Sequence, residues 1–306
     1  MRILIRDSLA SLFRVLPPLR GKNRIGLPLI HLLTNYQVEK ECIVTLKMRD
    51  GSLMQIDLRS FEEKVFLTGE YDFGIIQRLS NILEPGCTIF DVGANIGFYS
   101  IALGRKLKNV SGSKIWAIEA VQSNFNRLTR MVELNELKDI ISPVNIALGN
   151  MQGEVLFHMT DEGKSSTGNA IWVKEGIPHS RQPHTKAYMT RLDDFTKENN
   201  INKCDLIKVD IEGAELDFIL GGTNFINKTL PLIFSEFNPD ITKEFGYSFT
   251  DFSQLMKSYK YNLYRQQGLK NFVPIEKNLT RLSNIIMIPQ VKSNKTLLEQ
   301  LGIVSS

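Results

Sequence analysis

Hydrophobic and polar residues alternate in two short stretches early in the chain. Residues 44–48 and residues 53–58 both alternate with a period of two, and Arg49-Asp50-Gly51 lies between them. A period of two is typical of half-buried strands, and a Gly-containing turn joins two such strands into a hairpin. The pattern therefore predicts a hairpin within residues 41–59, followed by a helix at residues 73–83 that ends before Pro85-Gly86.

Downstream of residue 85, short apolar runs alternate with amphipathic segments. Strands are predicted at residues 88–92, 114–119, 140–148, 155–159, 205–210 and 232–236, with a closing pair at 261–264 and 284–288. Helices are predicted at residues 97–107, 124–135, 214–220 and 249–258, and Gly221-Gly222 favours a left-handed cap after the third of these helices. A polar, Gly- and Ser-rich loop is expected at residues 160–168.

This alternation of strands and helices predicts an α/β fold. We expect a Rossmann-like, mostly parallel seven-stranded sheet with helices on both faces. It would occupy residues 85–290, after a small N-terminal subdomain (residues 1–84, helical and hairpin) and before a C-terminal tail (residues 291–306). The residues that determine substrate specificity are expected in the loop at residues 160–186, in the N-terminal subdomain and after Glu236.

Composition and charge narrow the class of partner. The 37 Lys and Arg residues against 33 Asp and Glu residues give a formal charge of +4 over 306 residues. Nucleic-acid-binding proteins concentrate more positive charge on one face, so we expect no nucleic-acid partner. Cys42, Cys87 and Cys204 match no zinc or redox motif, which favours reduced thiols in a cytoplasmic protein and, for the last two, buried positions.

The first residues of the chain leave two interpretations open. Residues 1–19 mix apolar side chains with Arg2, Arg6 and Arg14. This segment either packs on the body of the protein or forms a basic amphipathic helix that contacts a membrane surface. No apolar run approaches the roughly 20 residues that span a bilayer. The expected location is cytoplasmic, with or without peripheral membrane association, and the sequence does not indicate an oligomeric state.

A strand, a turn and a helix start follow one another at residues 89–100. Gly93 and Gly97 allow a ligand to approach the backbone closely, and a helix N-terminus offers free N–H groups. The spacing differs from the G-x-G-x-x-G of dinucleotide-binding proteins, because Asn95 stands at the position of the middle glycine.

Two acidic residues next to this turn favour a different cofactor. Asp91, near the end of the first strand, would repel a pyrophosphate but suits a ligand with an ammonium or sulfonium group. Glu119 ends the second strand, where an acidic side chain can bind ribose hydroxyls. These residues favour S-adenosylmethionine, and thus a methyltransferase. A nicotinamide-dependent oxidoreductase and a catalytically silent cofactor-binding module are the alternatives.

Several stretches of the chain resemble, in order, the motifs of the FkbM family of methyltransferases. They are residues 90–100, Ile118-Glu119 with Asn124, residues 145–148, Arg191-Leu192-Asp193, and residues 206–215. The resemblance covers residues 69–236, with two departures: the family has Tyr-Glu where this chain has Tyr71-Asp72, and it favours prolines where this chain has Ala120 and Gln122.

The resemblance implies S-adenosylmethionine-dependent methylation of a hydroxyl group. The acceptor would be a small molecule or a saccharide: a sugar, glycan, glycolipid or natural product. The cofactor contacts implied are Tyr71, Asp91, Gly93, Ala94, Asn95, Gly97, Glu119, Asn124, Ala147 and Asp210.

Catalytic candidates come from the strand ends on the cofactor side. Methyl transfer from a sulfonium is mainly a matter of alignment, but a sugar hydroxyl needs help to lose its proton. Asp210, Glu212 and Glu236 are the candidates for that role. The alternative, a divalent cation held by Asp210, Glu236 and Asn238, is not favoured, and no metal ligand is assigned. Glu215 is assigned to the positive end of a helix dipole.

Overall fold

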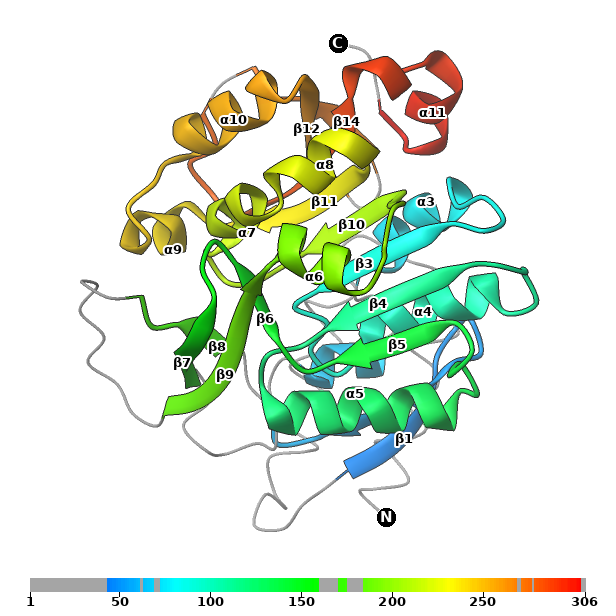
Figure 1. The fold of residues 1–306 in the computed structure, drawn as a ribbon. Coiled ribbons are helices and arrows are strands. Elements are labelled where there is room, and N and C mark those ends of the chain that lie inside the picture. Colours follow the sequence, from blue (N-terminus) through cyan, green and yellow to red (C-terminus); the bar gives the residue numbers. More distant parts are fainter. Residues whose placement is uncertain are drawn as a thin grey trace.

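The structure is a computed structural model that describes residues 43–60, 63–68, 72–159, 170–174, 184–268, 271–276 and 278–303 (Figure 1). β1 (Ile43–Lys47) and β2 (Leu53–Asp57) pair antiparallel, which confirms the predicted hairpin. The short 3₁₀ helix η1 (Glu63–Thr68) and the helix α3 (Phe73–Asn81) follow.

The main sheet confirms the predicted α/β fold. In the described part of the chain it has eight strands in the order β13-β12-β14-β11-β10-β3-β4-β5. The strands are β3 (Thr88–Val92), β4 (Lys114–Ile118), β5 (Ile141–Val144), β10 (Leu206–Val209), β11 (Leu232–Phe237), β12 (Tyr261–Gln267), β13 (Asn271–Pro274) and β14 (Ser283–Pro289). The five strands from β11 to β5 are mutually parallel, whereas β14, β12 and β13 pair antiparallel. The eighth strand is β13, an edge strand that the sequence pattern did not reveal.

Helices cover both faces of this sheet because successive strand residues point to opposite sides. Ile89 belongs to a hydrophobic cluster with α3, α4 (Phe98–Leu107) and α5 (Gln122–Leu134). Phe90, the next residue, belongs to a second cluster on the other face. The helices of that second cluster include α6 (Leu192–Glu198), α7 (Glu215–Gly221), α8 (Thr223–Thr229) and α10 (Phe249–Ser258).

A second, four-stranded sheet corrects part of the sequence interpretation. It has the order β6-β9-β7-β8 and comprises β6 (Ala147–Gly149), β7 (Gly153–Met159), β8 (Ala170–Trp172) and β9 (His184–Arg191), green in Figure 1. The single strand predicted at residues 140–148 is wrong: β5 and β6 belong to different sheets. The Asn145 amide donates to the backbone oxygens of Glu119 (2.8 Å) and Ala120 (3.1 Å), which fixes the chain between the two strands.

The predicted left-handed cap at Gly221-Gly222 is also wrong. Gly222 has φ −113°, and α8 begins directly after it. Gly221 is small for another reason, since a Cβ there would lie 1.8 Å from the backbone oxygen of Gly149. The glycine therefore allows α7 to pack closely on the end of β6.

Both flanking segments pack against the main sheet where they are described. Leu46, Met54 and Ile56 of the hairpin join the first hydrophobic cluster. Near the C-terminus, α11 (Lys295–Gln300) precedes the fully buried Leu301. The division of the chain at residues 84 and 290 stays a prediction.

The described residues contain no helix that is long and apolar enough to cross a membrane. Residues 1–42, which include Cys42 and the segment with two open interpretations, lie outside the described residues. Cys87 and Cys204 are free and buried, as predicted.

Candidate active site

A cavity of about 330 Å³ lies at the carboxyl ends of β3, β4, β10 and β11. Its lining includes Gly93, Glu119 and Asp210, which directly follow β3, β4 and β10, and Glu236, the next-to-last residue of β11. In open α/β sheets, ligands bind at this edge, and the volume is in the range of small-molecule sites.

The turn after β3 forms the floor of the cavity. The backbone N–H groups of Gly93 and Ala94 both donate to the Ile118 oxygen, at 3.0 and 2.9 Å. Gly93 has φ +72°, and a Cβ there would lie 1.9 Å from the backbone oxygen of Asp210. Asn95 also has positive φ, and its N–H donates to Glu119 Oε2 at 2.8 Å. Turn, β4 and β10 are therefore held together tightly enough to require glycine at position 93.

Gly97 supports the same turn without lining the cavity. It is the N-cap of α4 with φ 95°, and an added Cβ would lie 2.6 Å from Leu128 Cδ1. The residue is needed for close packing of α4 on α5, and its expected contact with the cofactor stays a prediction.

Glu119 is a buried carboxylate at the cavity wall. Oε1 accepts from the Val121 N–H at 2.9 Å, and Oε2 accepts from the Asn95 N–H. Burial raises the pKa of Glu119, although these backbone hydrogen bonds and the Asn124 side chain counteract the rise. Because an ionised carboxylate offers about four acceptor sites, capacity is left for ligand hydroxyl groups. Asn124 and Ala147 line the cavity beside it.

Asp91 is placed differently from the expected contact with a cationic ligand. Its side chain is fully buried and does not line the cavity. Asp91 Oδ2 accepts from Ser100 Oγ at 2.6 Å, and Oδ1 lies 3.3 Å from Lys208 Nζ. The positive charge beside Asp91 is thus the protein's own lysine.

Lys208 is the site residue that the sequence analysis missed. It lines the cavity from β10, donates to the Gly93 oxygen at 2.8 Å and lies 3.8 Å from Asp210 Oδ2. Burial lowers the pKa of Lys208, but the carboxylates around it, first Asp91 and then Asp210, raise the pKa above its ordinary value. A signal was present: the side chain is the one charged residue in the otherwise apolar run Leu206-Ile207-Lys208-Val209.

The three predicted catalytic acids all line the same cavity: Asp210, Glu212 and Glu236. Burial raises the pKa of Glu236 to about 7, and the neighbouring carboxylates of Asp210 and Asp72 add to the rise. Burial also raises the pKa of Asp72, which accepts a hydrogen bond from the Tyr99 hydroxyl at 2.8 Å. Tyr71 lies outside the described residues.

Asp210, Glu236 and Asn238, considered above as ligands of a divalent cation, do not all line the cavity. Asn238 Oδ1 accepts from the Asp240 N–H at 3.1 Å and caps α9 (Pro239–Glu244), and Asn238 does not line the cavity. Among the described residues, no group of three or more His, Cys, Asp or Glu side chains could hold a metal ion.

Glu215 braces the turn before α7. Its Oε1 accepts from the N–H groups of Ile211 and Gly213, at 3.1 and 3.3 Å. Burial raises the pKa of Glu215 to about 7. This carboxylate contacts protein groups and is absent from the cavity lining, in line with the structural role assigned to it.

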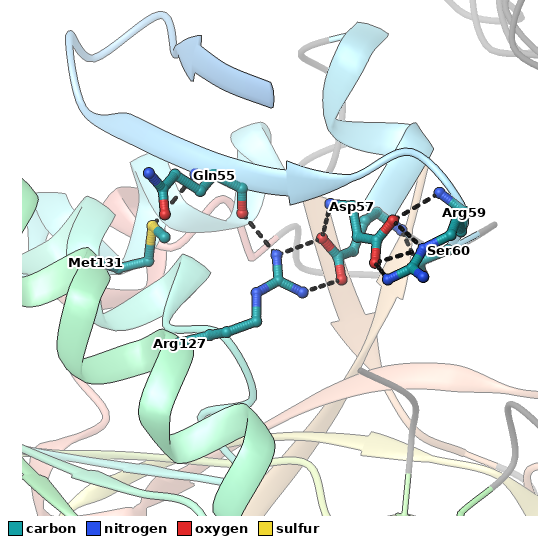
Figure 2. Close-up of polar contacts among 7 residues, drawn as sticks. Gln55, Asp57, Arg59, Ser60, Arg127 and Met131 are labelled. Atoms are coloured by element: carbon teal, nitrogen blue, oxygen red, sulfur yellow. Dashed lines mark hydrogen bonds and ion pairs between the residues drawn. The ribbon is translucent and has the colours of Figure 1, made fainter. Parts of the chain in front are cut away.

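The N-terminal region contributes another wall that motif analysis did not reveal. Glu63, Val65 and Phe66 of η1 line the cavity. In Figure 2, Arg127 reaches from α5 toward Gln55 and Asp57. Its guanidinium binds the Glu63 carboxylate and thereby anchors η1. Arg127 also donates to the Gln55 oxygen at 2.7 Å.

The second sheet closes the cavity with apolar side chains. Phe157, Trp172 and Met189 line it from β7, β8 and β9. Lys174 lies 5.5 Å from the centre of the Trp172 ring and 2.9 Å from the buried carboxylate of Asp217. This ion pair ties β8 to α7 and thereby holds Trp172 at the cavity.

Comparison with known proteins identifies methyltransferases as the relatives of this chain, the class that the sequence motifs predicted. The sequence profile described as "Methyltransferase FkbM domain" matches residues 91–263. The hexuronic acid methyltransferase AglP of Haloferax volcanii is 25% identical over 185 residues, which cover 58% of this chain and 68% of that protein. Methyltransferase 1 of Beauveria bassiana is 28% identical over 146 residues, covering 44% of this chain and 57% of that protein.

Among solved structures, a methyltransferase FkbM from Methylobacillus flagellatus KT is 15% identical, with a TM-score of 0.41. The match covers 94% of this chain and 58% of that one, so the chain spans little more than half of that protein's length. The profile match covers more than half of the chain. The protein therefore belongs to the methyltransferase FkbM domain family, and its cofactor is S-adenosylmethionine.

Proposed function

We propose that this protein is an O-methyltransferase that methylates a hydroxyl group of a sugar-containing acceptor, with Glu236 as general base. The observation that carries the proposal is the position of Glu236: it lines the cavity at the end of β11, and its pKa is raised to about 7. A general base works best when its pKa lies near the pH of the reaction.

The residues at the cavity fit the cofactor. Glu119 has acceptor capacity for ribose hydroxyls, and the glycine turn at Gly93 brings backbone to the cavity wall. The carboxyl groups of Asp210, Glu212 and Glu236 also line the cavity, and negative charge there suits a cationic sulfonium ligand. We assign Gly93, Ala94, Asn95, Glu119, Asn124, Ala147 and Asp210 to cofactor binding on this basis.

When bound, S-adenosylmethionine supplies an electrophilic methyl group. The chain has to hold the acceptor hydroxyl in line with that group and to exclude water. The apolar wall of Phe157, Trp172 and Met189 serves the second purpose. The Glu236 carboxylate would take up the proton that the acceptor hydroxyl loses, while the bond between sulfur and the methyl group breaks and neutral S-adenosylhomocysteine leaves.

A saccharide acceptor is supported by the relative from Haloferax volcanii, which is a hexuronic acid methyltransferase by name. The motif resemblance points to the same class.

The test is a transfer assay with S-adenosylmethionine and a panel of hexuronic acids, neutral monosaccharides, short glycans and non-sugar alcohols, read by mass spectrometry. We expect at least one sugar to gain a methyl group, and Glu236→Gln to lower kcat by about 10²–10⁴-fold. Glu244→Gln, an exposed glutamate on α9, is the control and should leave kcat unchanged. Cofactor binding without transfer to any acceptor would instead support the silent binding module.

A further inference from the structure

The ammonium group of Lys208 contacts three segments of the site: β3, the turn after β3 and the end of β10. Nζ donates to the backbone oxygen of Gly93 at 2.8 Å and lies 3.3 Å from Asp91 Oδ1 and 3.8 Å from Asp210 Oδ2. The ammonium also lies 5.4 Å from the centre of the Tyr99 ring. The contact with Gly93 is a hydrogen bond, and the contacts with Asp91 on β3 and with Asp210, which follows β10, are ion pairs.

The lysine is unusual because its side chain is almost completely buried, with 5% of its surface exposed. An isolated buried ammonium costs several kcal/mol, so such a group persists only with paired charges around it. Asp91 provides that charge from below the cavity and is itself fully buried. Asp91 therefore stabilises the ammonium of Lys208 in its position between Gly93 and Asp210.

We propose that Lys208 is a positioning residue: it fixes the Gly93 turn against β10 for the cofactor, and its charge keeps the Glu236 carboxylate available as a base. The second half rests on the proposed role of Glu236. The role of Lys208 in holding the turn rests on geometry alone. The Gly93 turn and the end of β10 are in close contact, since a Cβ on Gly93 would lie 1.9 Å from the backbone oxygen of Asp210.

Lys208 and Glu236 line the same cavity from the neighbouring parallel strands β10 and β11, and Lys208 lies opposite Phe234, two residues before Glu236. The charges around these two residues determine the direction in which each pKa should move. Asp91, Asp210 and Glu119 act on Lys208. Around Glu236, the acids are Asp210, Asp72 and Glu215, all of which raise its pKa, whereas Lys208 lowers it. Lys208 is thus the cation that opposes three carboxylates, and its removal should make Glu236 harder to ionise.

Two single variants separate charge from structure. Lys208→Met removes the positive charge and should raise the pKa of Glu236. Asp91→Asn removes a negative charge next to Lys208 while keeping the ammonium, and should lower the pKa of Glu236. A merely structural role predicts no such opposite shifts.

Folding needs a separate safeguard, because Lys208→Met leaves Asp91 buried without its cation. The double variant Asp91→Asn/Lys208→Met removes both charges together and should fold. Its Glu236 pKa should lie above that of Asp91→Asn. Lys208→Arg keeps the charge, so it should preserve the Glu236 pKa more closely than Lys208→Met does.

The experiment is a ¹³C carboxyl NMR titration of each variant without cofactor, with the Glu236 signal assigned by its loss in Glu236→Gln. Calorimetric titration with S-adenosylhomocysteine measures the turn: the dissociation constant should rise about tenfold in Lys208→Met, from loss of one charge-assisted hydrogen bond. The proposed effect of Lys208 on the Glu236 pKa would be overturned if the pKa did not change, or if it moved in the same direction in Lys208→Met and Asp91→Asn. The proposed role of Lys208 in holding the Gly93 turn would be overturned if Lys208→Met bound S-adenosylhomocysteine as tightly as the wild type. If Glu236→Gln keeps full methyl transfer, the base assignment fails, and the NMR shifts still decide the role of Lys208.

Discussion

Arg127 of α5 and Glu63 of η1 form a buried, bidentate ion pair. Arg127 Nη1 lies 2.6 Å from Glu63 Oε1, and Arg127 Nη2 lies 2.8 Å from Glu63 Oε2. Glu63 Oε2 also accepts from the Asp57 N–H at 2.6 Å. Because Glu63 lines the cavity, this pair connects the N-terminal hairpin, the cavity wall and the helix that follows Glu119.

Removal of one member of this pair should therefore be costly. Arg127→Met leaves the Glu63 charge buried without its cation, and we expect the free energy of unfolding to fall by about 3–5 kcal/mol. Arg130→Met on the same helix removes an exposed arginine and should change it by less than about 0.5 kcal/mol. Urea unfolding of both variants measures the difference, and equal values would contradict a stabilising role for the pair.

Gly93 is predicted to be irreplaceable for cofactor binding. In Gly93→Ala the new methyl group would overlap the Asp210 oxygen, so the turn must move. Gly86→Ala is a matched control, with φ +75° against +72° and nothing within 4 Å of the added Cβ. The control should cost about 1–2 kcal/mol of stability from backbone strain and retain S-adenosylhomocysteine binding. Gly93→Ala should lose that binding. Similar affinities in the two variants would mean that the close approach is unimportant.

Methyl transfer should depend on pH through Glu236. A general base is active when ionised, so kcat should increase as the pH rises toward about 7 and level off above it. Glu236→Gln should remove this limb and leave a low, nearly flat profile. A wild-type rate that is constant between pH 5 and 8 would argue against Glu236 as the base.

Stability should depend on pH through Glu215. Its folded-state pKa of about 7 lies above the ordinary value of 4.5, so the folded protein holds a proton that the unfolded chain releases. The resulting stabilisation is fully present below pH 4.5 and is lost as the pH rises through about 7. Glu215→Gln should flatten the free energy of unfolding across this interval, as measured by urea denaturation at several pH values. A slope identical to that of the wild type would show that Glu215 is ionised throughout.

The fold was predictable to the extent that local patterns determine it. The hairpin, the central strands and the glycine turn at Gly93 each have a strong local signature. The split at Asn145 does not, because it depends on hydrogen bonds to backbone oxygens more than twenty residues away. β13 escaped prediction for a similar reason: a short edge strand has little apolar pattern of its own.

The site was predictable in its acids and less so in its cation. Glu119 and Asp210 follow strands and Glu236 lies at the carboxyl end of β11. Parallel strand ends meet at one edge of a sheet, so the convergence of these acids follows from the pattern. Asp91 was placed near the ligand from the same logic, but its side chain points beneath the turn to Lys208. The alternation of residues along a strand indicates which side chains share a face of the sheet. It does not reveal that the Asp91 side chain is fully buried and does not line the cavity, which depends on the three-dimensional structure.

The most direct test of the account is calorimetric titration of the protein with S-adenosylhomocysteine, repeated on Glu119→Gln and on Glu133→Gln, an exposed glutamate of α5. The account predicts binding by the wild type and by Glu133→Gln, with affinity at least tenfold weaker in Glu119→Gln, about 1.4 kcal/mol. Absence of binding by the wild type, or equal affinity in all three proteins, would contradict the assignment of this cavity as the cofactor site.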